Sequence, residues 1–166
     1  MVFPDFPRAE VYPPAKADTP FTVLTEDRQN QALLLDLAGQ HGPRLLVREA
    51  WSKILPRCGI LISSALSGGS FAQRVTEAAD TYPRRCWLLI EPIAMEFPLP
   101  CLTGFGNDIT ITNYGKQFFS ESLCCQYTHF IRNQQGFMVL WDTEETLRRK
   151  TALAKAAGFL GYVRAP

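Results

Sequence analysis

The sequence predicts an α/β fold, namely a mostly parallel sheet with flanking helices and one β-hairpin insertion. Strand and helix signals alternate along residues 21–91, which is typical of parallel strands joined by crossover helices. Two apolar segments then flank a short polar turn at residues 133–136, and this pattern predicts a hairpin. A further helix and a last strand follow, so the alternation resumes after the hairpin.

The first two strands are predicted at residues 21–25 and 44–48, in short apolar runs. Between them, leucines form an apolar helical face over residues 30–40. Gly42 and Pro43 follow directly, and this pair is a strong signal for the end of a helix. The sequence therefore predicts a first strand–helix–strand unit.

The third and fourth strands are predicted at residues 59–65 and 86–91. A helix over residues 70–81 joins them, and Ser70 is placed to cap its first turn. The segment 50–58, which precedes the third strand, predicts a short helix that stops near a proline.

After the fourth strand, residues 98–121 are predicted to form a long loop with a helical turn. The hairpin strands follow at residues 123–132 and 136–142. A last strand is predicted at residues 159–163.

The final helix is predicted over residues 143–157. Asp142 and Glu145 have the spacing of a capping box, so Asp142 is expected to cap this helix. The apolar periodicity places the basic run that ends in Lys150 mostly toward solvent. Gly158 is expected to end the helix.

Length and composition indicate one globular domain at residues 21–166, preceded by a proline-rich arm at residues 1–20. The net charge of +1 provides no electrostatic basis for binding nucleic acid or an anionic membrane. Because no signal peptide or spanning segment is recognisable, we expect a cytoplasmic protein that contacts neither nucleic acid nor membrane.

The cysteines show no zinc or redox spacing, and neither histidine lies at a recognised distance from them. The odd number of cysteines and the adjacent pair argue against a disulfide framework. We expect buried, reduced thiols, no metal and no cofactor. The five cysteines are Cys58, Cys86, Cys101, Cys124 and Cys125.

Two carboxylates, Glu91 and Glu96, lie at the end of the fourth predicted strand. In parallel α/β folds the carboxyl ends of the strands form the ligand site, which makes these acids candidates for ligand contact. Side chains alternate along a strand, so residues five apart face opposite sides, and Pro92 makes a uniform strand unfavourable there. Only one of the two acids is therefore expected to point into a pocket.

A serine- and glycine-rich turn precedes the helix at residues 70–81, and this geometry can present backbone amides to an anion. The turn matches neither the phosphate-binding loop nor the dinucleotide fingerprint, so a simple capped turn is the stronger interpretation. The acids that begin the last helix are explained by their favourable interaction with the helix dipole, without any ligand. His129 lies in a predicted strand of the hairpin, which favours a structural role over a catalytic one. The alternative anion-binding residues are Ser67, Gly68, Gly69 and Ser70.

The order of features from residue 87 to residue 163 resembles the end of a family-18 glycoside hydrolase barrel, of the bacterial type that acts on spore-wall peptidoglycan and chitin-like glycans. The segment WLLIEPIAMEFPLP is similar to the seventh strand of that barrel and its proline-containing end. The hairpin, the helix after it and the segment GFLGYV are similar to the insertion, the last helix and the eighth strand. The segment RCGILISSALSGG corresponds to the sixth strand.

This resemblance implies a partial (β/α)-barrel-like domain with a glycan-like or other small polar ligand at the strand ends. Two features of the family are absent: the acid motif D-x-x-D-x-D-x-E and the tryptophan at the end of the eighth strand. Six strands also cannot close an eight-stranded barrel alone. The ligand-binding residues that the resemblance implies are Glu91, Glu96, Phe97, Tyr127, Trp141 and Asp142.

The leading hypothesis is thus a glycoside-hydrolase-like α/β domain that binds its ligand without cutting it, since no catalytic residue can be named. One alternative is a structural, self-associating protein, related to sporulation, which would form homo-oligomers. Another is an enzyme that handles phosphate or nucleotides with the serine- and glycine-rich turn.

Overall fold

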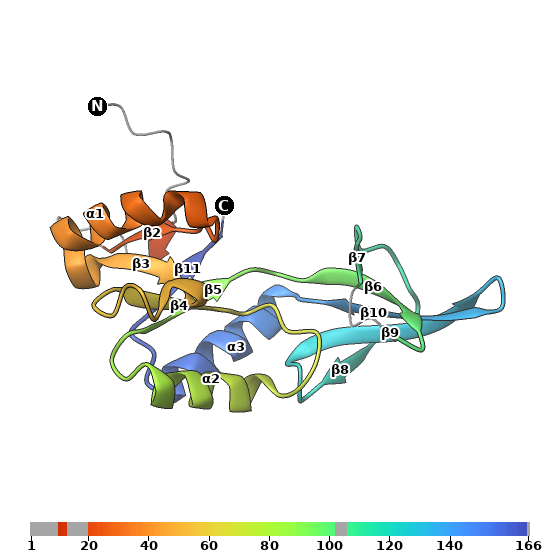
Figure 1. Cartoon of the computed structure of the whole chain (residues 1–166). Coiled ribbons are helices and arrows are strands. Elements are labelled where there is room, and N and C mark those ends of the chain that lie inside the picture. Colours follow the sequence, from red (N-terminus) through yellow and green to blue (C-terminus); the bar gives the residue numbers. More distant parts are fainter. Residues whose placement is uncertain (1–9, 13–19, 102–105, 166) are drawn as a thin grey trace.

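A computed structural model of the chain describes residues 10–12, 20–101 and 106–165. These residues form two β-sheets, called sheet A and sheet B, and three α-helices. Figure 1 shows that sheet B extends away from the rest of the molecule, while the helices lie with sheet A.

Sheet A is curled into half of a barrel, with the strand order β1-β11-β5-β4-β3-β2. The five strands from β11 to β2 are parallel, as the alternating sequence pattern predicts, and β1 pairs with β11 in the antiparallel direction. The fold class is therefore confirmed. The strands are β1 (Glu10–Tyr12), β2 (Phe21–Val23), β3 (Leu45–Arg48), β4 (Gly59–Ser63), β5 (Cys86–Ile90) and β11 (Tyr162–Arg164).

The three predicted long helices are present as α1 (Gln31–His41), α2 (Phe71–Thr81) and α3 (Glu144–Ala156). Ser70 caps α2 as predicted, because its hydroxyl accepts a hydrogen bond from the amide of Gln73 at 3.3 Å. The prediction of a short helix at 50–58 is wrong beyond its first residues. Three 3₁₀ turns complete the helical segments: η1 (Arg28–Asn30), η2 (Gly42–Arg44) and η3 (Glu49–Trp51).

The two faces of sheet A carry different apolar clusters. Residues of α1, α2 and α3 join the larger cluster, where Leu34, Phe71 and Leu147 pack against alternate residues of the strands. The remaining strand residues form the inner cluster, which is covered in part by the ring of Trp87. A Cβ on Gly161 would lie 2.5 Å from this ring, so the glycine makes room for it. The inner cluster consists of Leu46, Leu61, Leu89 and Val163.

Sheet B is a five-stranded antiparallel sheet in which the predicted hairpin, β9 and β10, is present. The hairpin turn is formed by Asn133 and Gln134, whose positive φ angles of 51° and 62° match the twist of the strands. The prediction of one long loop at residues 98–121 is wrong, because three strands reach into this range. The strands are β6 (Ala94–Leu99), β7 (Asn107–Asp108), β8 (Phe118–Ser120), β9 (Cys125–Arg132) and β10 (Gln135–Trp141).

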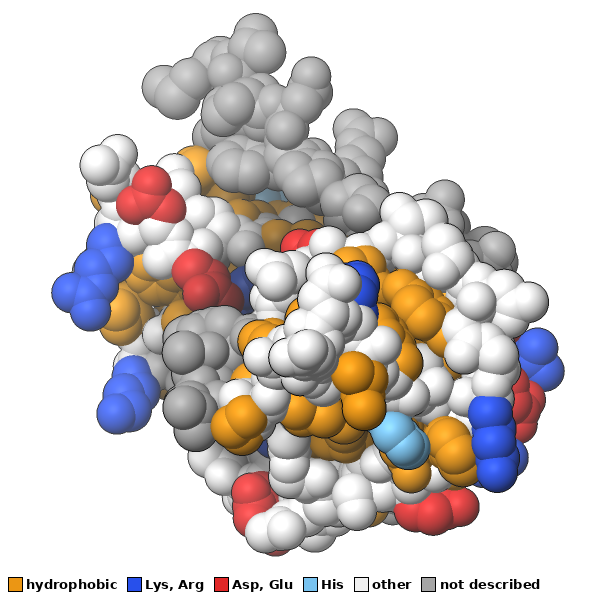
Figure 2. Space-filling view, turned by 90° about the vertical axis from the view of Figure 1, so that its right-hand side faces the viewer, with side chains coloured by type: hydrophobic (Ala, Val, Ile, Leu, Met, Phe, Trp, Pro, Cys, Tyr) orange, Lys and Arg blue, Asp and Glu red, His pale blue; other side chains and the backbone are white. Residues whose placement is uncertain are grey.

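One face of sheet B is apolar as far as its tip. Figure 2 shows hydrophobic side chains gathered at the end of the molecule that sheet B forms, and Ile131 there is 80% exposed. The registers of the strands place the members of this face side by side. From the tip inwards the apolar members are Leu99, Ile131, Phe97, Met138, Met95, Leu140, Tyr127 and Phe118, and the exposed His129, opposite Met138, lies on the same face.

A buried hydroxyl on β2 offers a test of the packing of sheet A. Thr22 is 4% exposed, and its Oγ1 has no hydrogen-bond partner among the described residues. Thr22→Val is therefore expected to raise the free energy of unfolding by about 1 kcal/mol, because it removes an unpaired buried polar group at nearly constant shape.

Urea denaturation would measure this change, with Thr128→Val as the matched control. Thr128 is also buried, but its hydroxyl donates to the carbonyl of Lys116 at 2.8 Å, so its loss should destabilise the protein. Equal losses in the two variants would contradict the expected difference.

Candidate functional site

Three polar side chains end neighbouring strands on the inner face of sheet A. Arg48, Ser63 and Glu91 come two residues after Leu46, Leu61 and Leu89, so the alternation of the strands places them on the same side. Arg48 forms a bidentate pair with Glu91, in which Nη1 lies 3.3 Å from Oε2 and Nη2 contacts Oε1. The hydroxyl of Ser63 donates to Glu91 Oε2 at 2.6 Å. We call these three residues the strand-end cluster.

Arg48 also joins the strand-end cluster to the end of β2. Its Nε donates to the carbonyl of Leu24 at 3.0 Å and lies 3.7 Å from a carboxylate oxygen of Glu26. The side chain of Arg48 is about one quarter exposed, so water still reaches the pair with Glu91. The cluster is thus a half-buried hydrogen-bonded network at the mouth of the half-barrel.

A cleft of about 570 Å³ opens beside the strand-end cluster, between α2 and the segment that follows β3. Two further contacts join residues that line this cleft. Arg74 pairs with Glu49, and the hydroxyls of Ser52 and Tyr82 lie 3.3 Å apart. The lining is rich in charged and hydroxyl groups. It comprises Glu26, Arg48, Glu49, Ala50, Ser52, Lys53, Leu61, Ser63, Arg74 and Tyr82.

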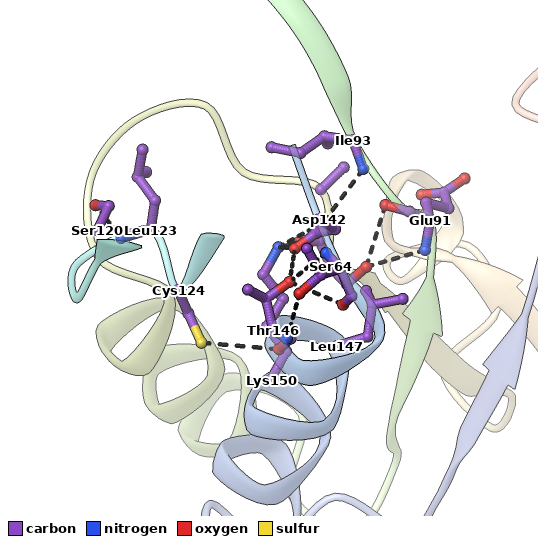
Figure 3. A network of polar contacts seen from close by, with 12 residues as sticks. Ser64, Glu91, Ile93, Ser120, Leu123, Cys124, Asp142, Thr146, Leu147 and Lys150 are labelled. Carbon is purple, nitrogen blue, oxygen red and sulfur yellow. Dashed lines mark hydrogen bonds and ion pairs between the residues drawn. The ribbon is translucent and has the colours of Figure 1, made fainter. Parts of the chain in front are cut away.

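Ser64, the residue after β4, connects Glu91 of the strand-end cluster to the buried Lys150. The Ser64 hydroxyl accepts from the amide of Glu91 at 2.9 Å and donates to its carbonyl at 3.2 Å. The Ser64 carbonyl accepts from Lys150 Nζ at 2.9 Å. Figure 3 shows this chain of contacts leading from β5 through the end of β4 to α3.

Lys150 and Asp142 form an ion pair whose side chains are both 0% exposed, with Nζ 2.8 Å from Oδ1 and 2.9 Å from Oδ2. Thr146 donates to Oδ1 and the amide of Ile93 to Oδ2, so both carboxylate oxygens are satisfied (Figure 3). The prediction that Lys150 faces solvent is wrong, because the buried carboxylate draws the ammonium inward.

The prediction that Asp142 caps α3 is wrong as well. The N-cap is Thr143, whose hydroxyl accepts from the amide of Thr146 at 3.2 Å, while the Thr146 hydroxyl accepts from the amide of Thr143 at 2.9 Å. Two threonines therefore form the capping box. Asp142 is free to pair with Lys150 because the neighbouring hydroxyls satisfy the helix amides.

The other acid of the predicted site lies in sheet B. Glu96 is on β6, where its carboxylate pairs with Arg132 at 2.7 Å. Glu91 directly follows β5 of sheet A, and the chain breaks before β6, so the two acids are positioned by different sheets. Neither acid is among the residues that line the cleft described above, so the expectation that one of them faces a ligand stays a prediction.

The three aromatic residues among the predicted ligand-binding residues also belong to sheet B. Phe97 is buried on the apolar face together with Tyr127, which stacks on Phe118 with ring centroids 5.4 Å apart. Trp141 is buried on the opposite face, with its ring centroid 6.4 Å from that of Tyr114. None of these predicted residues is among those that line the cleft.

The turn at Ser67–Ser70 retains little capacity for an anion. Of the first amides of α2, that of Phe71 donates to the carbonyl of Ser122 at 2.7 Å, and that of Gln73 donates to the Ser70 hydroxyl. Gly68 and Gly69 contribute a tight turn, in which Gly69 has φ +80°. Its role as an anion site stays a prediction that the geometry does not favour.

The buried thiols do not offer a nucleophile. Burial raises the pKa of Cys86 and of Cys125 to about 11, and it also raises the pKa of Cys58 and Cys124. Because the thiolate is the reactive form, these groups are inert at neutral pH. Among the described residues, no group of three or more His, Cys, Asp and Glu side chains is arranged to hold a metal ion.

Sequence reasoning missed Arg48, Ser63 and Arg74, which shape the mouth and the cleft. Arg48 and Ser63 end predicted strands, so the rule that selected Glu91 could have selected them too. Arg74 had no such signal, because its partner Glu49 lies 25 positions earlier in the chain.

No protein-family model matches this sequence, and no curated protein matches it. Solved structures do match its fold. The spore cortex-lytic enzyme SleL of Bacillus megaterium aligns over 86% of this chain with a TM-score of 0.58 and 10% identity. SleL of Bacillus cereus aligns over 87% with a TM-score of 0.56 and 11% identity.

A third match is ydhD of Bacillus subtilis, assigned as a sporulation-specific glycosylase, with a TM-score of 0.57 and 9% identity over 86% of this chain. The present chain spans 44% of the length of each SleL and 64% of that of ydhD. The helices of the described segments are too short or too polar to cross a bilayer. At 9–11% identity, the likeness to these solved structures concerns the α/β fold alone.

Proposed function

We propose that this chain is a glycoside-hydrolase-like domain that binds a glycan in the cleft beside the strand-end cluster without hydrolysing it. The observation on which the proposal rests is the cluster itself, in which Arg48, Ser63 and Glu91 meet at the carboxyl ends of three parallel strands. This is the edge of a parallel α/β sheet at which ligands bind.

The balance of charge in the cleft supports a neutral polyhydroxyl ligand. Its lining holds three cations, Arg48, Arg74 and Lys53, and two carboxylates, Glu26 and Glu49. Glu91, which lies outside the lining but pairs with Arg48, adds a third carboxylate. Three positive and three negative groups leave no excess charge to attract a phosphate. Paired guanidinium and carboxylate groups instead present planar donors and acceptors side by side, which suits sugar hydroxyls.

The same contacts argue against hydrolysis. Glycosidases use two carboxyl groups, one of which donates a proton to the leaving oxygen. Both oxygens of Glu91 accept hydrogen bonds from Arg48 and Ser63, and Asp142 is fully buried against Lys150. Neither carboxylate points freely into the cleft, and the acid motif of family 18 is absent from the sequence.

The relation to family 18 and to sporulation belongs to this proposal. The folds of SleL and ydhD support it, and the segment WLLIEPIAMEFPLP is its counterpart in the sequence. The cytoplasmic location expected from the sequence stays a prediction. The phosphate- or nucleotide-handling alternative receives no support from the balanced charges of the cleft.

The proposal is tested by titrating the protein with N-acetylglucosamine oligomers and with inorganic phosphate, using calorimetry. We expect the oligomers to bind and phosphate not to. Arg74→Ala should weaken glycan binding roughly 10- to 100-fold, as expected for lost hydrogen bonds to a charged group. Arg149→Ala is the matched control, because Arg149 lies over Phe119, outside the cleft.

A fluorogenic chitobioside provides the second measurement, and no turnover is expected. Turnover that disappears in Glu91→Gln would overturn the non-hydrolytic part of the proposal. Phosphate binding without glycan binding would instead favour the anion-handling alternative, and no binding of either would favour a structural role.

A further inference from the structure

We propose that Ser64 is a positioning residue of the cleft: by holding the backbone of Glu91, its hydroxyl fixes the carboxylate that orients Arg48. Arg48 lines the cleft, whereas Ser64 and Glu91 do not, so Ser64 acts on a ligand only through its neighbours. The inference rests on the proposed function where it concerns glycan binding, and on the contacts alone where it concerns Arg48.

Ser64 is fully buried at the point where the pairing of β4 with β5 ends. Its amide donates to the carbonyl of Leu89 at 2.8 Å. Its hydroxyl accepts from the amide of Glu91 at 2.9 Å and donates to the carbonyl of the same residue at 3.2 Å. Pro92 comes next and has no amide hydrogen, so it cannot continue the ladder of the strand. One side chain thus holds both backbone groups of the residue that follows β5.

Ser64 is itself held from the interior of the protein. Its carbonyl accepts a hydrogen bond from Lys150 Nζ at 2.9 Å, and this ammonium is paired with the buried carboxylate of Asp142 (Figure 3). A hydrogen bond from a charged donor is stronger than one between neutral groups. A shift of Ser64 would leave a buried ammonium proton without its acceptor, which makes this residue a rigid support for Glu91.

The support matters because the pair of Glu91 and Arg48 is bidentate. Two contacts between a carboxylate and a guanidinium form together only when the two planar groups are aligned. Such alignment is kept to within about 0.5 Å only when neighbouring residues fix the side chains concerned. Without the Ser64 hydroxyl, we expect Arg48 to keep its bond to the carbonyl of Leu24 and to lose the fixed orientation of its Nη groups.

Nuclear magnetic resonance of the guanidinium groups tests this inference in the absence of any ligand. In the parent chain, the bidentate pair should hinder rotation about the Nε–Cζ bond of Arg48 and keep the signals of Nη1 and Nη2 separate. Arg48→Lys identifies these signals, because it removes them. In Ser64→Ala the two signals should merge, whereas in Thr128→Val they should stay separate. Thr128 is the matched control, because its hydroxyl is also buried and bonded to a carbonyl but lies in sheet B.

Calorimetric titration with N-acetylglucosamine oligomers then measures the effect on the cleft. Ser64→Ala should weaken binding about 10-fold, as expected for the loss of one hydrogen bond, and Thr128→Val should leave binding unchanged. If the parent chain binds no oligomer, the proposed function fails, and the Arg48 signals still decide whether Ser64 positions that side chain.

Three results would overturn the proposal: Arg48 signals already merged in the parent chain, signals that stay separate in Ser64→Ala, or equal weakening of glycan binding in Ser64→Ala and Thr128→Val. If Ser64→Ala does not fold, the double variant Asp142→Leu, Lys150→Met decides instead. It removes both buried charges and, with them, the hydrogen bond to the Ser64 carbonyl. Its Arg48 signals should merge, and separate signals would contradict the inference.

Discussion

Asp142→Ala is expected to lower the free energy of unfolding by about 3–5 kcal/mol, because it leaves the ammonium of Lys150 buried without its counter-charge. The remaining partner of Nζ is the carbonyl of Ser64, which satisfies one of three donors. The amide of Ile93 and the hydroxyl of Thr146 lose an acceptor as well. The effect should therefore exceed that of an ordinary helix cap.

Thr143→Ala is the control that separates the two roles proposed for this turn. It removes the cap of α3 and should cost about 0.5–2 kcal/mol. Urea denaturation midpoints at constant slope measure both variants. The double variant Asp142→Leu, Lys150→Met should recover much of the loss, because it removes both charges together. An Asp142→Ala variant no less stable than Thr143→Ala would show that the ion pair contributes little.

Phe71→Ala is expected to destabilise the protein by about 3–5 kcal/mol, through lost apolar burial and the cavity that remains. Phe71 is fully buried at the first position of α2, in the cluster that joins the helices to sheet A. Lys150 Nζ also lies 5.5 Å from the centre of its ring. The substitution therefore also removes the ring beside Lys150, whose ammonium connects α3 to the residue that follows β4.

Phe137→Ala on sheet B is the matched control. Phe137 is half-buried, and Arg132 lies over its ring at 4.3 Å, so its removal opens no enclosed cavity and should cost less. Combining Phe71→Ala with Asp142→Ala should give less than the sum of the single effects, because both act on the surroundings of Lys150. Full additivity would show that the ring and the ion pair are independent.

The sequence alone determined the parallel direction of the strands in the half-barrel and the approximate place of each strand in the chain. Strand runs such as residues 59–63 and 86–90 are apolar, and helix signals such as Ser70 and Gly158 lie within one or two positions of the observed boundaries. These features were predictable because they depend on neighbours in the chain: a hydroxyl caps the next turn, and glycine tolerates positive φ. Glu91 was predictable for the same reason, as the residue that follows a buried strand.

Only the tertiary structure decided which groups meet. Lys150 belongs to a basic run that periodicity assigns to solvent, yet it is buried because Asp142, eight positions earlier, and Ser64, 86 positions earlier, both face it. Arg48 and Glu91 are 43 positions apart and meet only because β3, β4 and β5 are neighbours in one sheet. Glu96 continues the same stretch of sequence and is carried into another sheet. Pairings of this kind depend on strand order and burial, and a local pattern contains neither.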